Sequence, residues 1–167
     1  MNENYTIQLF FECIAVGTYC LFLFSLLQYF NLEWKNTLFL LGFSKHFIGY
    51  FLGFHSAYCQ YGANCQLNRT PYMKTIHYER IVKNITIIGE SIIEGFVFLL
   101  LGWILYKNGI KNNYINVFFI GFFLHILSDI LGFHTYICRS CTIQKEIEGW
   151  TQDEIRDKIV RLNSSLV

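Results

Sequence analysis

A repeated sequence constrains the fold of this chain more than any other feature. Residues 42–59 and 121–138 align at a fixed offset of 79, with eight identical positions. The shared pattern is Gly-x3-His-x6-Gly-Phe-His-x3-Cys, and four of the five histidines of the chain lie in these two segments. Identity at a fixed spacing is the signature of a repeated structural unit. The sequence therefore predicts two halves with the same fold.

The repeat extends upstream of these segments. Glu12 and Gly17 match Glu90 and Gly95 at an offset of 78, so one residue is inserted in the second half. Each unit then consists of one helix that carries Glu-x4-Gly and a second helix that carries the two histidines and the cysteine. We expect the two units to pack about a pseudo-twofold axis.

Four apolar stretches indicate that the chain crosses a membrane. Hydrophobic residues make up 53% of the chain and charged residues only 15%, which leaves too little polar surface for a soluble domain. Residues 5–29, 37–59, 85–106 and 114–138 each exceed the roughly 20 apolar residues that a transmembrane helix needs. No basic region precedes the first stretch, so we do not expect a removable signal peptide. The sequence predicts an all-α membrane protein with four transmembrane helices.

The predicted architecture is a tandem repeat of a two-helix hairpin. Residues 1–59 form the first repeat and residues 85–138 the second. Residues 60–84 form a polar connection with a possible interfacial helix after Thr70-Pro71, and residues 139–167 form a polar tail. In this tail, a Thr-x-x-Glu capping box at 151–154 predicts a short C-terminal amphipathic helix. Two spans per repeat give both halves the same orientation, which makes this a parallel repeat.

The distribution of basic residues predicts the orientation. Nine Lys and Arg residues lie on the side of the termini, and three lie in the opposite connections. The positive-inside rule therefore predicts that both termini are cytoplasmic. On that side the glycosylation sequon Asn68-Arg-Thr70 would stay unmodified.

A duplicated His-x3-Cys pattern suggests a zinc site. Residues four apart share a helix face, so each histidine and its cysteine point the same way. Two such pairs supply two imidazoles and two thiolates, a ligand set of structural zinc. The four candidate ligands are His55, Cys59, His134 and Cys138. Glu12 and Glu90, at similar depth, could orient the imidazoles as second partners.

A simpler interpretation of the same residues needs no metal. A carboxylate inside the bilayer is costly unless it is paired. Glu12 and Glu90 could therefore each pair with a histidine at that depth, which we expect to be His55 or His134. In this interpretation, small residues such as Gly53 and Gly132 mark close helix contacts.

The cysteines offer a redox alternative. Cys59 with Cys65, and Cys138 with Cys141, are candidate redox pairs on one side of the membrane. A CxxC motif after a membrane helix resembles the four-helix membrane thiol oxidoreductases in span count and in this one motif. The predicted cytoplasmic orientation counts against it, because cytosolic thiols are normally kept reduced.

The second half carries further intramembrane charge. Glu94 lies four residues after Glu90, and Asp129 lies four residues after His125, so each pair shares a helix face. Glu94, His125 and Asp129 could line a path for protons or cations, and a channel of this size would need to oligomerise. The alternative is a polar cluster that fixes the register of the helices.

These features favour a structural or scaffolding membrane component over an enzyme. A small proton or divalent-metal transporter and a membrane thiol-disulfide oxidoreductase are the alternatives. The chain contains no Gly-rich phosphate loop and no basic patch for nucleic acid. The expected partners are the bilayer and other copies or membrane proteins, reached through the C-terminal amphipathic helix. The preference for Phe, Tyr, Ile, Asn and Lys suggests an AT-rich genome, such as that of a large DNA virus or a protist.

Overall fold

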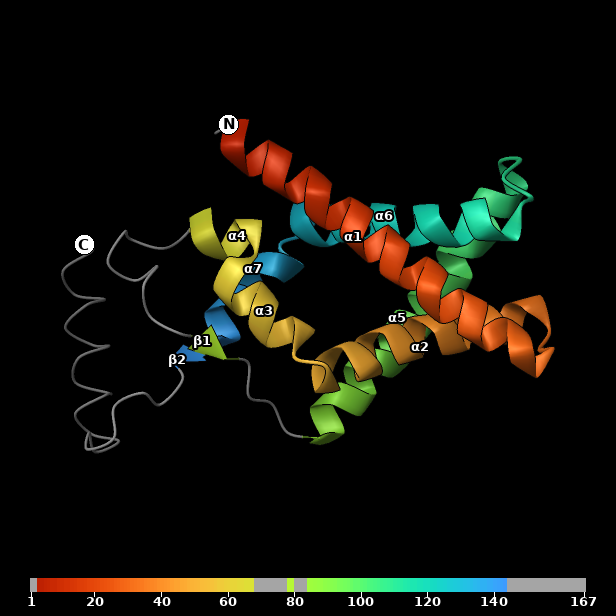
Figure 1. Cartoon of the computed structure of the whole chain (residues 1–167), viewed down its shortest axis with the longest axis horizontal. Coiled ribbons are helices and arrows are strands. Elements are labelled where there is room, and N and C mark those ends of the chain that lie inside the picture. The colour runs from red at the N-terminus through yellow and green to blue at the C-terminus, as the bar shows by residue number, and fades with distance from the viewer. Residues whose placement is uncertain (1–2, 68–77, 80–83, 144–167) are drawn as a thin grey trace.

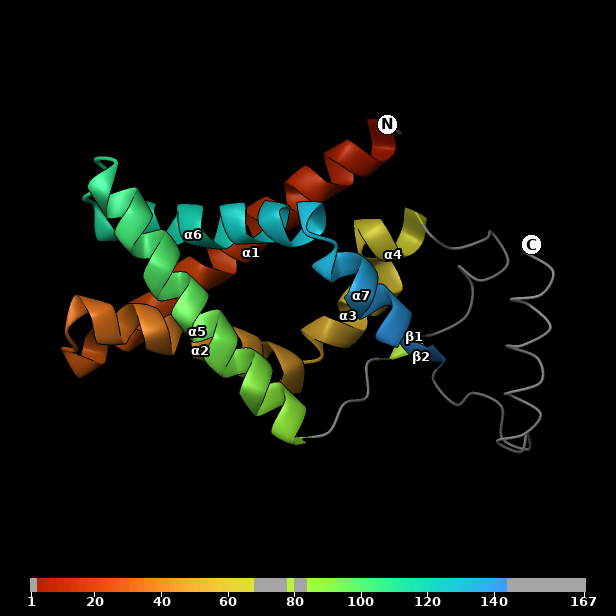
Figure 2. The same cartoon turned by 180° about the vertical axis from the view of Figure 1, so that it is seen from behind.

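The computed structural model describes residues 3–67, 78–79 and 84–143. Four long helices dominate these residues (Figure 1). Their bounds are α1 (Glu3–Leu27), α2 (Trp34–Phe51), α5 (Asn84–Lys107) and α6 (Asn113–Ile130). The connections between α1 and α2 and between α5 and α6 lie together at one end of the bundle. A reversed view shows the same arrangement (Figure 2).

Short elements gather at the opposite end of the bundle. They are α3 (Phe54–Tyr61), α4 (Ala63–Leu67), α7 (Phe133–Ser140) and the two-residue strands β1 (Tyr78–Glu79) and β2 (Thr142–Ile143). β1 pairs with β2 in the antiparallel sense. A 3-10 turn, η1 (Gln28–Phe30), ends the first long helix. We refer to the end of the bundle that carries α3, α4 and α7 as the cap end.

The lengths and compositions of the helices support a membrane protein. Asn4–Phe30, Ile85–Lys107 and Asn113–Ile130 are each long and apolar enough to cross a bilayer. Trp34–Phe51 and Phe54–Leu67 meet the same test together, but with a bend of 72° between them. The fold is therefore helical with three candidate spans, or four if the bent pair is one span.

The two halves are interlocked. α1 packs mainly against α6, and α2 packs mainly against α5, so the first helix of each half contacts the second helix of the other. A Cβ atom at Gly17 would lie 2.8 Å from Phe118, and one at the equivalent Gly95 would lie 2.8 Å from Phe39. These contacts correspond under the repeat, because Phe39 and Phe118 are themselves 79 residues apart. The absence of a Cβ at these glycines is what lets the helices approach.

Gly53 and Gly132 act differently from our expectation. Both have a left-handed backbone, with φ of 76° and 77°, and a Cβ at either position would meet nothing within 4 Å. Their N–H groups donate to the carbonyls of Tyr50 and Asp129, which ends the preceding helix. The prediction that they mark close helix contacts was therefore wrong: they stop α2 and α6 and let α3 and α7 start in a new direction.

An apolar core lies between α1, α2, α5 and α6, toward the end that carries the two connections. Phe24, Leu38, Leu41, Phe98 and Ile120 are among its fully or almost fully buried members. Aromatic contacts extend it, since Phe24 meets both Trp34 and Tyr114 edge to face. The buried side chains of this cluster are apolar and pack against one another.

Cys13, Gly17 and Cys20 form a stripe of small residues on one face of α1. Cys13 and Cys20 are buried free thiols. A Cβ at Gly121 would lie 2.7 Å from the sulfur of Cys20, which places α6 directly on this stripe. The Thr70-Pro71 interfacial helix, the sequon at Asn68 and the C-terminal amphipathic helix lie outside the described residues.

Candidate functional site

Two carboxylate–imidazole pairs lie between the helices, one in each repeat-related position. Glu12 Oε2 on α1 lies 3.1 Å from His125 Nε2 on α6. Glu90 Oε2 on α5 lies 3.0 Å from His46 Nε2 on α2. The two pairs are equivalent under the repeat, and each joins the carboxylate of one half to the imidazole of the other. Each of these contacts thus lies at one of the two helix pairs that pack most extensively, α1 with α6 and α2 with α5.

The second histidine of each half lies behind the first. The ring centroids of His46 and His55 are 4.6 Å apart, and those of His125 and His134 are 4.4 Å apart. We therefore define the first cluster as Glu90, Glu94, Lys45, His46 and His55. The second cluster comprises Glu12, Asp129, His125, His134 and the residues that bond to them. The direct partners of the two glutamates are His125 and His46, rather than His134 and His55 as the sequence interpretation had expected.

The first cluster contains its own cation. Lys45 on α2 forms an ion pair with Glu94 on α5. The other oxygen of Glu94 lies 2.7 Å from His46 Nδ1. His46 therefore sits between two carboxylates, with Glu90 on its Nε2 side. The lone lysine that the sequence places in a membrane helix is thus neutralised across the interface of the halves.

The second cluster is built around Asp129. This carboxylate accepts hydrogen bonds from the hydroxyl of Tyr5 and from Asn64 Nδ2, the latter at 3.1 Å. His134 Nδ1 lies 3.3 Å from the same oxygen that Asn64 reaches. Thr135 donates to Asn64 Oδ1 at 3.3 Å, which fixes the amide. Residues from α1, α4, α6 and α7 therefore meet at one carboxylate.

Glu12 also holds the cap end in place. Its Oε1 accepts the backbone N–H of Ala63, the first residue of α4, at 2.7 Å. The Nε2 of Gln8 lies 3.3 Å from the same oxygen. A carboxylate at a helix N-terminus satisfies a donor that the helix itself leaves unpaired. Glu12 thus links α4 to the second cluster.

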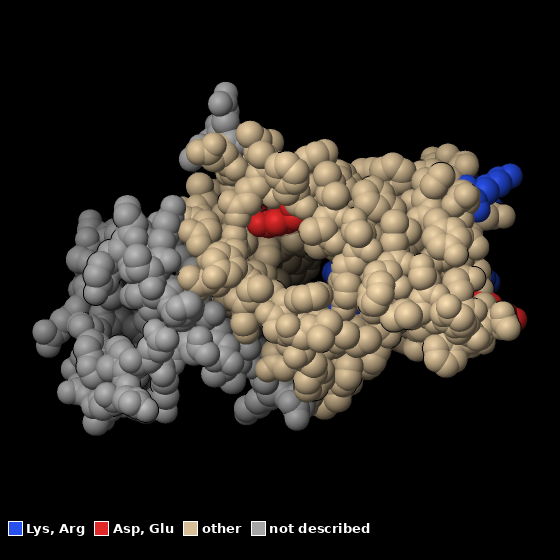
Figure 3. Space-filling model, in the orientation of Figure 1, with Lys and Arg blue, Asp and Glu red and all other residues tan. Residues whose placement is uncertain are grey.

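Both clusters are shielded but not sealed. The side chain of His125 is 10% exposed and that of Glu90 is 24% exposed. In the space-filling view the surface is hollowed between the helices, with acidic atoms at the rim and basic atoms inside (Figure 3). His134, on α7 beyond the α6 span, has its pKa lowered to about 4 by burial and by the neighbouring His125. At neutral pH its imidazole is uncharged and donates to Asp129 through Nδ1.

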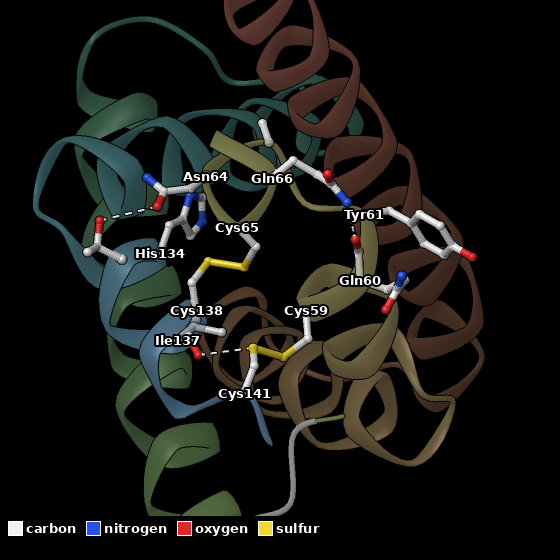
Figure 4. Close-up of a disulfide and its surroundings, with 12 residues drawn as sticks. Cys59, Gln60, Tyr61, Asn64, Cys65, Gln66, His134, Ile137, Cys138 and Cys141 are labelled. Carbon is white, nitrogen blue, oxygen red and sulfur yellow. Dashed lines mark hydrogen bonds between the residues drawn. A yellow bond between two sulfur atoms is a disulfide. The ribbon is translucent and has the colours of Figure 1, made fainter. Parts of the chain in front are cut away.

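Two disulfides, nested in the sequence, join the two halves at the cap end (Figure 4). Cys59 is bonded to Cys141, and Cys65 is bonded to Cys138. Cys59 and Cys138 are repeat equivalents, so each binds a cysteine that follows the equivalent position in the other half. The expected pairs, Cys59 with Cys65 and Cys138 with Cys141, are not the pairs that form. The two bonds join Cys59 of α3 to Cys141 at the end of α7, and Cys65 of α4 to Cys138 of α7.

The disulfides also remove the proposed zinc ligands. Zinc binds thiolates, and the sulfurs of Cys59 and Cys138 are already bonded to Cys141 and Cys65. Within the described residues, no group of three or more His, Cys, Asp or Glu side chains is arranged to hold a metal ion. The predicted set of His55, Cys59, His134 and Cys138 is therefore not formed. Glu12 and Glu90 serve as direct partners of His125 and His46 instead.

The suggested ion path divides between the two clusters. Glu94 belongs to the first, where Lys45 and His46 engage it. His125 and Asp129 belong to the second. The sequence analysis grouped these three residues as one possible path, and the structure assigns them to different contacts.

Sequence reasoning missed the role of His46 and His125, although a signal was present. Both histidines are identical positions of the repeat. The two histidines lie where α1 packs on α6 and where α2 packs on α5, and the periodicity of the sequence does not reveal which helices pack together. Tyr5 and Asn64 carried no signal, since each is a single polar residue brought in by the fold.

Comparison with known proteins gives no relative. No protein-family model, no curated protein and no solved structure matches this chain.

Proposed function

We propose that this chain is a structural component of a membrane, in which two interlocked halves form one rigid unit with four spans. The observation that carries the proposal is that polar contacts between the long helices and both disulfides join the halves. The pairs Glu12–His125, Glu90–His46 and Lys45–Glu94 each connect one half to the other. Both disulfides do the same. Such contacts fix the register of helices that have no hydrophobic driving force to associate within lipid.

The apolar core supports this proposal over the transporter alternative. A path for ions needs polar or hydrated groups along its whole length. Between the clusters and the two connections, the interior is filled by buried side chains such as Leu41, Phe98 and Ile120. An ion that reached either cluster from the cap end would meet this hydrocarbon layer.

Flux and stability measurements separate these functions. The purified protein is reconstituted into vesicles loaded with a pH-sensitive or zinc-sensitive dye, alongside protein-free vesicles. We expect no added proton or zinc flux, and we expect Glu12→Gln to lower the free energy of unfolding without altering the dye signal. A flux that depends on Glu12 or Glu90 would replace the structural proposal with a transporter.

The exposed apolar side chains indicate the immediate partner. Large residues such as Phe11, Phe51, Phe96 and Trp103 are more than half exposed on the outer faces of α1, α2 and α5. Exposed apolar area of this extent is stable only in lipid or against another protein. We therefore include lipid contact, and self-association in the membrane, in the proposed role.

A second candidate function is thiol–disulfide exchange at the cap end. The observation that favours it is that Cys138, in the last turn of α7, and Cys141, directly after this helix, are half-buried. Their partners Cys65 and Cys59 are fully buried. One thiolate of a partner dithiol would attack Cys138 and release Cys65 as a thiol. The second partner thiol would then displace Cys138 from the mixed disulfide, which forms the partner disulfide and leaves Cys65 and Cys138 as thiols. The two electrons and two protons now held by Cys65 and Cys138 would leave to a lipid-soluble quinone. His134, one turn before Cys138, is placed to exchange the proton.

Turnover with a model dithiol tests this candidate. The protein is embedded in nanodiscs that contain a quinone, and a dithiol peptide is added. The redox function requires many peptides oxidised per protein, with loss of turnover in Cys138→Ser and no loss in the control Cys20→Ser. The structural function predicts that the peptide consumption stays below the number of disulfides present.

A further inference from the structure

The side of the membrane on which the cap end lies can be argued from two independent features. We propose that the cap end faces an oxidising, extracytoplasmic compartment, and that asparagines on this side accept N-linked glycans. The proposal concerns covalent modification and orientation, and it holds whether the chain is structural or redox-active. It reverses the orientation that the count of basic residues predicts.

The first feature is the state of the cysteines. All four cysteines of the cap end are in disulfides, and both pairs span more than 70 residues of sequence. The two remaining cysteines, Cys13 and Cys20, are buried among the long helices and are free. Disulfides persist in secreted, lumenal and surface environments, whereas cytosolic thiols are kept reduced. The two disulfides of the cap end are therefore the products expected in an oxidising compartment.

The second feature is the distribution of Asn-x-Ser/Thr sequons. The chain contains four: Asn4-Tyr-Thr6, Asn68-Arg-Thr70, Asn84-Ile-Thr86 and Asn163-Ser-Ser165. Asn4 lies in the first turn of α1 and Asn84 is the first residue of α5, and both of these helix ends lie opposite the two connections. In the sequence, Asn68 follows α4 and Asn163 follows β2. The connections at the other end, residues 28–36 and 108–112, contain asparagines but no sequon. The acceptors therefore segregate to the same end as the disulfides, as expected if that end is lumenal.

Asn4 is the acceptor whose side chain the structure describes. Asn4 is exposed in the first turn of α1. Asn84 is the first residue of α5, and Thr86 of its sequon is exposed. Asn68 and Asn163 lie outside the described residues and are taken from the sequence alone.

In the modification, the amide nitrogen displaces the diphosphate of a lipid-linked oligosaccharide at the anomeric carbon. The new N–C bond forms as the C–O bond breaks, and the amide loses one proton.

The count of basic residues does not outweigh these features. The positive-inside rule describes a bias in how spans are inserted, and neighbouring spans can override it. A disulfide is instead a chemical product that requires an oxidant on its own side of the membrane. Two disulfides in one compact cap therefore decide the orientation against nine basic residues.

Glycosylation during membrane insertion tests the proposal. The full chain is translated with microsomes derived from the endoplasmic reticulum, and half of the product is treated with an N-glycosidase. A matched pair of variants carries the same sequon-bearing Gly/Ser insert of roughly 30 residues, placed either between residues 68 and 69 or between residues 108 and 109. We expect a glycosidase-sensitive mobility shift for the unaltered chain. With both inserts made in a chain whose four native acceptors are replaced by Gln, we expect a shift for the first insert and none for the second.

Removal of the acceptors completes the design. The combined variant Asn4→Gln, Asn68→Gln, Asn84→Gln and Asn163→Gln should lose the shift, and single variants show which acceptors are used. A second set, with Ala in place of Thr6, Thr70, Thr86 and Ser165, guards against misfolding of the first set. Modification of the 108–109 insert alone would overturn the orientation. An unmodified chain with a modified 68–69 insert would overturn the glycan acceptors.

Discussion

The two polar clusters occupy equivalent positions of the sequence repeat, and different donors stabilise their carboxylates. Each contains a Glu–His pair between halves and a second histidine behind it. The first balances two carboxylates with the ammonium group of Lys45. Among the described residues, no Lys or Arg forms an ion pair with the carboxylates of the second. There, hydroxyl, amide and imidazole donors stabilise Asp129 instead.

The sequence positions explain how this divergence arose. Lys45 corresponds to Leu124 under the repeat, Glu94 to Val16, and Asp129 to Tyr50. The first cluster has an ion pair between α2 and α5, whereas the second has a carboxylate at the point where α6 ends. That carboxylate can reach α4 and α1, so the second cluster holds the cap end as well as the helices. One cluster is thus an internal clamp, and the other couples the spans to the disulfide-bonded cap.

The largest expected effect concerns what the clusters have in common, the cap that joins the halves. The disulfides enclose 82 and 73 residues of sequence. In the chain-entropy model, each contributes about 4 kcal/mol. We expect the pairs Cys59→Ala/Cys141→Ala and Cys65→Ala/Cys138→Ala to lower the free energy of unfolding in mixed micelles by similar amounts. A reduced sample of the unaltered protein is the control, and a loss confined to one pair would show that the cap is not symmetric.

The next prediction tests the difference between the clusters. Lys45→Met removes the only ammonium group of the first cluster and leaves Glu94 without its main counter-charge. Loss of one partner from a buried pair costs about 3 kcal/mol or more. The matched control Leu124→Met, at the equivalent position, should cost less than about 1.5 kcal/mol because it conserves volume. Adding Glu94→Gln to Lys45→Met should restore much of the stability; equal losses for Lys45→Met and Leu124→Met would refute the charge argument.

The sequence could predict the helical class and the long apolar helices, because these depend on composition and spacing. It could not predict which helices pair, since α1 with α2 and α1 with α6 satisfy the same periodicity. That choice decided the partners of Glu12 and Glu90, and the residues four apart in sequence proved less important than those joined across halves. Likewise, Gly53 and Gly132 were recognisable as special, but sequence alone does not separate a close contact from a left-handed turn.

Close packing should be equal in the two halves. Gly17→Ala and Gly95→Ala each place a Cβ about 2.8 Å from an aromatic ring carbon of the facing helix. Overpacking of this kind costs typically about 1–3 kcal/mol, and we expect both variants to fall in that range in micelle unfolding. Gly89→Ala is the control in α5, because a Cβ there meets nothing within 4 Å. A tolerated change at Gly17 with a large loss at Gly95 would mean that the halves pack differently.

The smallest effect distinguishes the two roles that glycine plays in this fold. Gly53 and Gly132 need a left-handed backbone, which costs an L-residue roughly 1–2 kcal/mol whatever its side chain. Because a Cβ at either position meets open space, Gly53→Leu should cost about as much as Gly53→Ala, and Gly132 should behave likewise. Gly49→Ala, in helical backbone with ordinary contacts 3.7 Å away, serves as the control and should be near neutral or slightly stabilising. If Gly53→Leu were far more damaging than Gly53→Ala, side-chain crowding rather than backbone geometry would explain why both halves keep this glycine.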